Sequence, residues 1–306
     1  MLKTLPVPQH QTTEPNVLIN AIQSRLPIKI SGLVENWPAS QWTFELLKAK
    51  IGAKKVKVLL DIPQAGGIFP GGQDKYEHIM TFTELIEHAQ CIKAPPCYLG
   101  FKRIHELSHD HTKDLDFSSL TPKSNEPTDT RLWLGSANTC SGLHSDLCDN
   151  VFAQIKGRKR VFLVPFEQTR LVYPFIDNIV NSQVDPENYS YHKFPKFIRA
   201  DVMETIVEPG DLLFIPRGWW HYLRSLAPSI SINHWFGKPV PDFTYLCLLA
   251  NLGPRYIKQT VMDMIRYSLL NCQYRQDFFF SPPSTGERLF NLLRHGDFSR
   301  RNNPTI

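Results

Sequence analysis

The sequence predicts a mainly β protein, a sandwich or barrel with flanking helices and a helical C-terminal region. Short β-branched or aromatic runs follow one another through the centre of the chain, separated by Gly and Pro turns, and this spacing is typical of a sandwich or barrel. From about residue 241, apolar residues recur instead with helical spacing. The chain has 306 residues, 42% of them hydrophobic, which is enough for the core of one large domain or of one domain with an appendage.

The first third of the chain predicts mixed α and β structure. The run KKVKVLL alternates charged and apolar residues, as a half-buried strand does. Thr81 and Glu84 have the spacing of a capping box, which marks the start of a helix. We expect strands over 24–33 and 54–60 and helices over 42–52 and 81–90.

The central strands are interrupted by clear turn signals. Gly157 lies between two basic residues, and Glu208-Pro209-Gly210-Asp211 has turn composition. The expected strand-forming runs are RLWLGSA, NVFAQIKG, KRVFLVP, ETIVEPGDLLFIP and SISINHWFG.

The C-terminal region predicts helices with one apolar face each. These faces are expected to cover the barrel or another subunit. The three phenylalanines of FFFSPPS, residues 278–284, are not expected to lie wholly in water. The helical apolar residues are Ile257, Val261, Met264, Ile265 and Leu269, then Leu289, Leu292 and Leu293.

Composition limits the classes of function. The net charge of +5 permits a nucleic-acid partner without indicating one. No run approaches the ~18 apolar residues of a membrane helix, and the N-terminal residues lack the apolar run of a signal peptide. The six cysteines form no C-x-x-C pair. We therefore expect a soluble, cytoplasmic protein with reduced cysteines and no membrane partner.

Two histidine arrangements could bind metal. The first, His105-Glu106-Leu107-Ser108-His109, is a literal H-E-x-x-H, which on a helix would suit a zinc hydrolase. Its neighbours are strongly polar, whereas the catalytic helix of such enzymes needs an apolar face to bury. A solvated loop or surface helix is the simpler interpretation.

The second arrangement is His144-Ser145-Asp146 with a distant His221. On an extended segment, residues i and i+2 point the same way, so His144 and Asp146 can reach one ion. His221, in PRGWWHYL, would supply the third ligand from a neighbouring strand. Two histidines and one carboxylate form the facial triad of non-haem Fe(II) sites.

Lys159 begins the strand that follows the hairpin after this motif. If Val161 and Leu163 face the core, strand alternation places Lys159 there too, and a buried lysine needs an anion. A basic, solvated hairpin containing Lys156, Arg158 and Lys159 is the alternative.

These motifs, in their order, resemble the JmjC-type, cupin-fold 2-oxoglutarate oxygenases, and within them an asparaginyl hydroxylase. The likeness covers roughly residues 95–237 and also includes PIKISGLVENWP near the N-terminus. It rests on S-x-x-H-x-D, N-x-F-A-Q-I-K-G-x-K-R, E-P-G-D-x-L-x-I-P-x-x-W-W-H and I-x-x-N-x-W.

The resemblance implies a double-stranded β-helix of the jelly-roll type. It also implies which ligand each site residue would contact. Fe(II) would lie between His144, Asp146 and His221, and Lys159 would pair with the distal carboxylate of 2-oxoglutarate. Further contacts to that cosubstrate would come from Ser141, where the family has threonine, and from Tyr98, Asn150 and Asn233. Trp219, Trp220 and Trp235 are expected at the mouth of the site.

The implied activity is hydroxylation of a C–H bond with Fe(II), 2-oxoglutarate and O2. The resemblance favours a protein or peptide side chain as substrate. A modified tRNA base and a non-catalytic, metal-binding cupin stay open. Aspartate in the triad favours hydroxylation over demethylation, since the histone demethylases of the family mostly use glutamate. Residues 1–240 would form the catalytic domain, and 241–306 a helical region that could make a homodimer.

Overall fold

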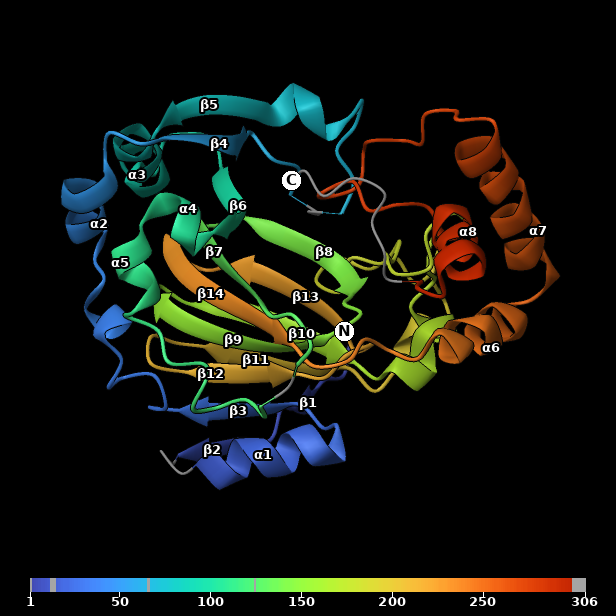
Figure 1. Cartoon of the computed structure of the whole chain (residues 1–306), viewed down its shortest axis with the longest axis horizontal. Helices are drawn as coiled ribbons and strands as arrows, with labels where there is room; N and C mark the ends of the chain where they lie inside the picture. Colours follow the sequence, from blue (N-terminus) through green and yellow to red (C-terminus); the bar gives the residue numbers. More distant parts are fainter. Residues whose placement is uncertain (1, 12–14, 65–66, 124, 299–306) are drawn as a thin grey trace.

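Two β-sheets face each other in the computed structural model of the chain, which describes residues 2–11, 15–64, 67–123 and 125–298 (Figure 1). One sheet has the strand order β1-β11-β10-β13-β8, and the other has β2-β3-β12-β9-β14-β7-β6-β4-β5. The bounds are β1 Leu5–Pro6, β2 Gln9–Gln11, β3 Ile28–Ser31, β4 Lys55–Leu60, β5 Glu77–Thr81, β6 Cys97–Arg103, β7 Asp129–Gly135, β8 Cys140–Ser145, β9 Asp149–Lys156, β10 Lys159–Val164, β11 Met203–Val207, β12 Leu212–Ile215, β13 Trp220–Ser225 and β14 Ser229–Phe236.

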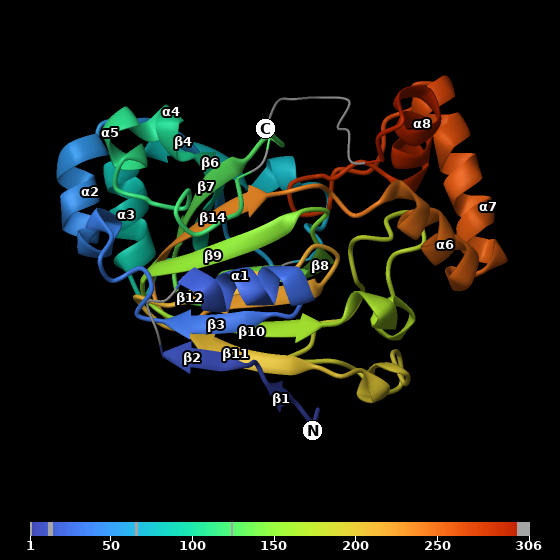
Figure 2. The same ribbon diagram turned by 60° about the horizontal axis from the view of Figure 1, so that its bottom comes forward.

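Strands β7 to β14 form a double-stranded β-helix, which confirms the predicted jelly-roll fold class. Four of them lie adjacent in the larger sheet, in the order β12-β9-β14-β7, and four in the smaller, in the order β11-β10-β13-β8. All pairs among neighbouring strands of this set are antiparallel. Helices from the N-terminal third and from the C-terminal region flank the sheets, as the predicted fold class required (Figure 2).

The N-terminal helices cover the outer face of the larger sheet. Apolar side chains of β9, β12 and β14 pack there against residues of the helices, including Leu18, Leu47 and Leu85. The two helices expected from the sequence are present, with the capping box at Thr81 and Glu84 formed. A first helix was not predicted. The helices are α1 Pro15–Ser24, α2 Phe44–Ile51, α3 Phe82–Gln90, α4 Ile104–Leu107 and α5 His109–Thr112.

The space between the two sheets is filled from alternate positions of their strands. Val161 and Leu163 of β10 are fully buried there, together with Phe152, Leu213 and Leu223. Such alternation follows from the two-residue period of a strand. Because Val161 and Leu163 face the core, alternation along β10 places Lys159 there too, as expected from the sequence.

The C-terminal helices stand beside one end of the sheets, at the right-hand side of Figure 1. A π-helical turn, Met264–Leu269, follows α7, so the expected apolar helix is not uniformly α-helical. At the point where α8 crosses this turn, a Cβ on Gly286 would lie 2.3 Å from the backbone nitrogen of Met264. The bounds are α6 Asp242–Leu252, α7 Pro254–Asp263 and α8 Thr285–His295.

The apolar face of α7 does not cover the barrel. Ile257, Val261, Ile265 and Leu269 are each about half exposed. Of the two expected roles, covering the barrel is therefore wrong for this face, and contact with another subunit stays a prediction. Among the described residues, no helix is both long and apolar enough to span a lipid bilayer.

Gly157, in the turn between β9 and β10, supports a stability prediction. Its φ is +72°, and an added Cβ would lie 2.2 Å from the carbonyl oxygen of Pro228. Gly296 has a φ of +69° with no atom within 4 Å of an added Cβ. Gly296→Ala thus carries only the left-handed backbone cost of about 1–2 kcal/mol.

We expect Gly157→Ala to lower the free energy of unfolding by a further ~1–3 kcal/mol, because overpacking adds to the same backbone cost. Urea denaturation of both variants measures the difference. Equal losses in the two variants would contradict the close approach at Pro228.

Candidate metal and cosubstrate site

Two histidines face each other across neighbouring strands. In the antiparallel register of β8 and β13, His144 lies opposite His221. Their ring centroids are 4.1 Å apart. The register brings together two residues separated by 77 positions in the chain, and it explains why His221 completes the pattern that begins at His144.

Asp146 follows the end of β8 and reaches the same point. One donor atom from each of His144, Asp146 and His221 lies within 4.8 Å of the others. The Nε2 of His221 is 3.4 Å from Oδ2 of Asp146. Within the described part of the chain, this is the group of histidine and acidic side chains that could hold a metal ion.

The backbone fixes which nitrogen of each imidazole faces the centre. Nδ1 of His144 lies 2.6 Å from the carbonyl oxygen of Gly142, and Nδ1 of His221 lies 3.0 Å from that of Trp219. A carbonyl only accepts, so both Nδ1 atoms carry protons and both Nε2 atoms keep their lone pairs. Such outer contacts orient metal-binding histidines in proteins.

The electrostatics of the cluster favour the protonation states of metal ligands. Burial, and then the neighbouring His221, lower the pKa of His144 to about 4, so this ring is neutral at pH 7. Burial alone would raise the pKa of Asp146, but His221, His144 and the Trp235 indole hold it below its ordinary value. Two imidazoles and one carboxylate are the donor set of the facial triad.

Lys159 is buried between the sheets, where strand alternation places it. Its side chain is 2% exposed. Nζ donates to the hydroxyl of Tyr98 at 3.4 Å and lies 5.5 Å from the ring centres of Tyr98 and Phe152. Burial lowers the pKa of Lys159 to about 7. No carboxylate in the described residues lies within salt-bridge distance, so the site can accept an anion.

Tyr98 and Ser141 complete a small polar pocket around Lys159. The Ser141 hydroxyl lies near enough to the Tyr98 hydroxyl to lower the pKa of Tyr98, although burial has the larger effect. Burial raises the pKa of Tyr98 above its ordinary value, so its proton is retained. Both predicted side chains therefore lie at Lys159, and each can donate to a bound anion.

The two predicted asparagines form a chain to the triad. Asn233 donates to Oδ1 of Asn150 at 3.0 Å, and Asn150 donates to Oδ2 of Asp146 at 3.5 Å. The Trp235 indole donates to the same oxygen at 2.7 Å. The asparagines thus contact one another and Asp146 in this structure, and their predicted contact with cosubstrate stays a prediction.

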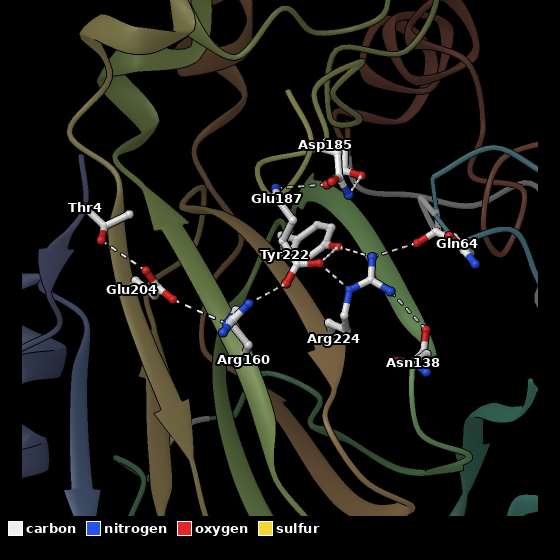
Figure 3. Close-up of polar contacts among 10 residues, drawn as sticks. Thr4, Gln64, Asn138, Arg160, Asp185, Glu187, Glu204, Tyr222 and Arg224 are labelled. Carbon is white, nitrogen blue, oxygen red and sulfur yellow. Dashed lines mark hydrogen bonds and ion pairs between the residues drawn. The ribbon is translucent and has the colours of Figure 1, made fainter. Parts of the chain in front are cut away.

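A second network of polar side chains links β10 and β13 on their outer face (Figure 3). Glu187 accepts hydrogen bonds from Tyr222 at 2.7 Å, from Arg160 at 3.2 Å and from Arg224. Arg160 neighbours Lys159 on β10, and Tyr222 neighbours His221 on β13. Because adjacent strand residues face opposite sides, Glu187 ties β10 to β13 behind Lys159 and His221.

A cavity of about 740 Å³ opens beside the triad. His144 and Asp146 line it, together with an aromatic wall that sequence reasoning largely missed. The sequence indicated Trp235, expected at the mouth, and the phenylalanines of FFFSPPS, as apolar residues that needed cover. The wall consists of Phe101, Trp133, Trp235, Phe279 and Phe280.

Two of the three tryptophans expected at the mouth are not there. Trp220 is fully buried on the outer face of β13, where its indole donates to Thr169 at 2.9 Å. Trp219 is 8% exposed and packs in the core between the sheets. Only Trp235 lines the cavity. Trp220 points away from His221 because consecutive strand residues face opposite sides, and Trp219, just before β13, packs between the sheets instead of lining the cavity.

The alternative zinc site at His105 and His109 is wrong. The helix it needs is broken: α4 ends at Leu107, Ser108 is extended with φ −164° and ψ 126°, and α5 begins at His109. Glu106, the required general base, forms an ion pair with Lys102. The two histidines therefore do not lie on one face of one helix.

Comparisons with known proteins agree with the geometry. A family profile described as a cupin-like domain matches residues 16–242. The chain is 34% identical over 218 residues to lysine-specific demethylase 8 of Xenopus tropicalis, covering 69% of this chain and 48% of that protein.

Two further relatives show similar coverage. Identity is 32% over 221 residues to lysine-specific demethylase JMJ30 of Arabidopsis thaliana, covering 69% of this chain and 50% of that one. It is 27% over 232 residues to human HSPB1-associated protein 1, covering 68% and 47%. The chain thus spans about half the length of the curated relatives it matches.

The unpaired Lys159 generates a prediction on stability. Its pKa is about 7 when folded and 10.5 ordinarily, so between these values the unfolded chain binds more protons and stability rises with pH. The destabilisation is complete below pH 7. We expect Lys159→Met to raise the free energy of unfolding by about 1–4 kcal/mol at about pH 6, and by less at about pH 9.5.

Urea denaturation of the metal-free protein without 2-oxoglutarate measures this effect. Lys156→Met, at an exposed position of the same hairpin, is the matched control and is expected to change stability little. A destabilised Lys159→Met protein at about pH 6 would show instead that the ammonium is already paired.

Proposed function

Because the chain belongs to the cupin-like domain family and is of the JmjC type, we propose that it is an Fe(II)- and 2-oxoglutarate-dependent dioxygenase acting on a protein side chain. One observation carries the proposal. The buried, unpaired ammonium of Lys159 lies between the same two sheets as the triad of His144, Asp146 and His221. A metal site alone would not require such an anion pocket.

The residues present fit the expected cofactors, Fe(II), 2-oxoglutarate and O2. His144, Asp146 and His221 would hold the metal through two imidazoles and one carboxylate, which leaves coordination positions for other ligands. Gly142 and Trp219 hold the imidazoles in the required tautomer.

The polar pocket around Lys159 would hold the cosubstrate. Lys159 is a point charge that suits a carboxylate, and Tyr98 and Ser141 each bring a hydroxyl to it. An anion there stabilises the charged form of Lys159 and offsets its burial. When bound, iron and 2-oxoglutarate supply the oxidative chemistry, in which succinate and CO₂ form and one oxygen atom enters a substrate C–H bond.

Hydroxylation of a protein side chain is the product we propose. Asp146 in the triad supports it, through the family resemblance drawn from the sequence. The aromatic wall offers apolar area for a side chain. Lysine demethylation is a second candidate, because two of the relatives carry the name lysine-specific demethylase.

Formation of succinate from 2-oxoglutarate by the iron-loaded protein tests the function. We expect His144→Ala to abolish turnover, and Lys159→Ala to raise the 2-oxoglutarate concentration required by about 30-fold or more, since a buried charge loses its partner. His105→Ala is the control and should retain turnover. Absence of turnover by the wild type with peptide and RNA substrates would refute the enzyme.

Product analysis separates the candidates. Mass spectrometry of an oxidised peptide that retains one added oxygen supports hydroxylation. Release of formaldehyde with loss of a methyl group supports demethylation, and modification of RNA alone supports the tRNA-base alternative. Binding of iron without turnover supports a non-catalytic cupin.

We also propose that the exposed face of α7 and the π-helical turn joins two copies of the chain. Ile257, Val261, Ile265 and Leu269 are 44%, 41%, 42% and 56% exposed. They recur at helical spacing, so together they form one apolar stripe. Stripes of this kind on soluble proteins commonly mark interaction sites.

We expect the double variant Val261→Glu, Ile265→Glu to convert a dimeric wild type to monomer, because two carboxylates would be buried without partners. Sedimentation velocity measures the change. Ile92→Glu, at a fully exposed position away from the stripe, should leave the dimer intact. A monomeric wild type at micromolar concentration would disprove this interface.

A further inference from the structure

Residues 274–283, here called the strap, return from the C-terminal helices to the cavity. The strap is hydrogen-bonded to the segment between β4 and β5: Phe69 N–H donates to Asp277 at 2.7 Å, and Gln73 N–H donates to Gln276 at 2.8 Å. Phe278 is fully buried and pairs with Ile68 in an isolated β-bridge. The strap lies beyond residues 16–242, the part matched by the family profile.

The side chain of Gln73 fixes the strap at its closest approach to the cavity. Its Oε1 accepts from the Phe280 N–H at 2.6 Å, and its Nε2 donates to Glu77 at 2.9 Å. Phe280 and Ser281 have φ of +54° and +39°. Such backbone persists only where the surrounding structure holds it, so this part of the strap has one imposed conformation.

Phe279 packs directly on the cosubstrate tyrosine. Its ring is stacked on Tyr98, with centroids 6.0 Å apart and planes at 7°, and on Phe69 at 5.7 Å and 6°. Trp133 contacts Tyr98 from another direction at 5.6 Å. The hydroxyl of Tyr98 is the group that Lys159 contacts. The position of that hydroxyl therefore depends on Phe279.

Phe280 forms part of the substrate side of the cavity. Its ring lies 5.2 Å from Phe101 and 5.5 Å from Trp133. The approach requires a glycine on β6, because a Cβ on Gly100 would lie 2.5 Å from the Phe280 ring and 2.9 Å from Trp133. The strap and β6 thus meet without space between them.

We propose that the strap completes the reaction site: Phe279 is a positioning residue that holds Tyr98 against the 2-oxoglutarate pocket, and Phe280 is a specificity-determining residue in the substrate wall. The inference rests on the proposed function, because it assigns Tyr98 to cosubstrate. It adds a part of the site that the matched cupin-like domain does not contain.

Binding of 2-oxoglutarate to the full-length, Mn(II)-loaded protein tests the role of Phe279 by calorimetry, without turnover. Phe279→Ala should raise the Kd about 3- to 10-fold, as expected for loss of an aromatic pair. Phe243→Ala removes the same ring from α6, where it is 74% exposed, and should leave the Kd unchanged. An unchanged Kd in folded Phe279→Ala protein would overturn the inference.

Gly100→Ala is the second variant. It displaces the strap but leaves the strap's own residues unchanged. Its Cβ meets Phe280 and Trp133, so we expect a higher Kd for 2-oxoglutarate here too. If Phe279→Ala does not fold, the two single variants Phe279→Leu and Gly100→Ala take its place. Wild-type Kd values for 2-oxoglutarate in both of them would overturn the inference. A wild type that binds no 2-oxoglutarate would refute the proposed function itself.

Amide hydrogen exchange of the wild type provides a readout of the strap. If Phe279 supports Tyr98, binding of 2-oxoglutarate to the Mn(II)-loaded protein should slow exchange in the peptide containing residues 276–283. The exposed segment at residues 91–93, which does not line the cavity, should exchange at the same rate with and without 2-oxoglutarate. Unchanged exchange in the strap despite binding would count against the proposal.

Discussion

The antiparallel register between β8 and β13 is the constraint on which the site depends. It sets His144 opposite His221, and a shift of one residue would turn one ring to the other side of its sheet. Glu187 links β13 to its other neighbour, β10, from outside, through Tyr222 and Arg160. His144, His221 and Lys159 therefore share one frame of paired strands, and Asp146 follows directly after the end of β8.

The ionisable side chains of the site are largely buried, and burial disfavours their charged forms. Within the triad, Asp146 keeps its charge because it accepts hydrogen bonds from Trp235 and Asn150 and lies beside His144 and His221. Lys159 has no comparable partner among the described residues, and its pKa falls to about 7. Buried ionisable groups with pKa values shifted this far cluster at functional sites in proteins.

The sequence sufficed for features that follow from local periodicity. Alternation along β10 placed Lys159 inside, and the capping box at Thr81 located a helix. The H-x-D pattern with a distant histidine correctly predicted that His144, Asp146 and His221 come together. Prediction from the sequence failed where tertiary contacts decide the local structure, as in the helix break at Ser108 and the burial of Trp220. No local pattern indicates that Phe279, some 180 residues from Tyr98, packs on that ring.

The contact between Gln73 and Phe280 spans 207 positions of the chain, and this separation has a consequence for biosynthesis. Chains emerge from the ribosome N-terminus first and domains begin to fold as they emerge. By the time His221 has been added, all three metal ligands exist, yet the residues that close the aromatic side of the cavity have not been translated. A nascent chain can therefore bring His144, Asp146 and His221 together before the aromatic side of the cavity is closed, and the arrival of residues 274–283 decides when both are present.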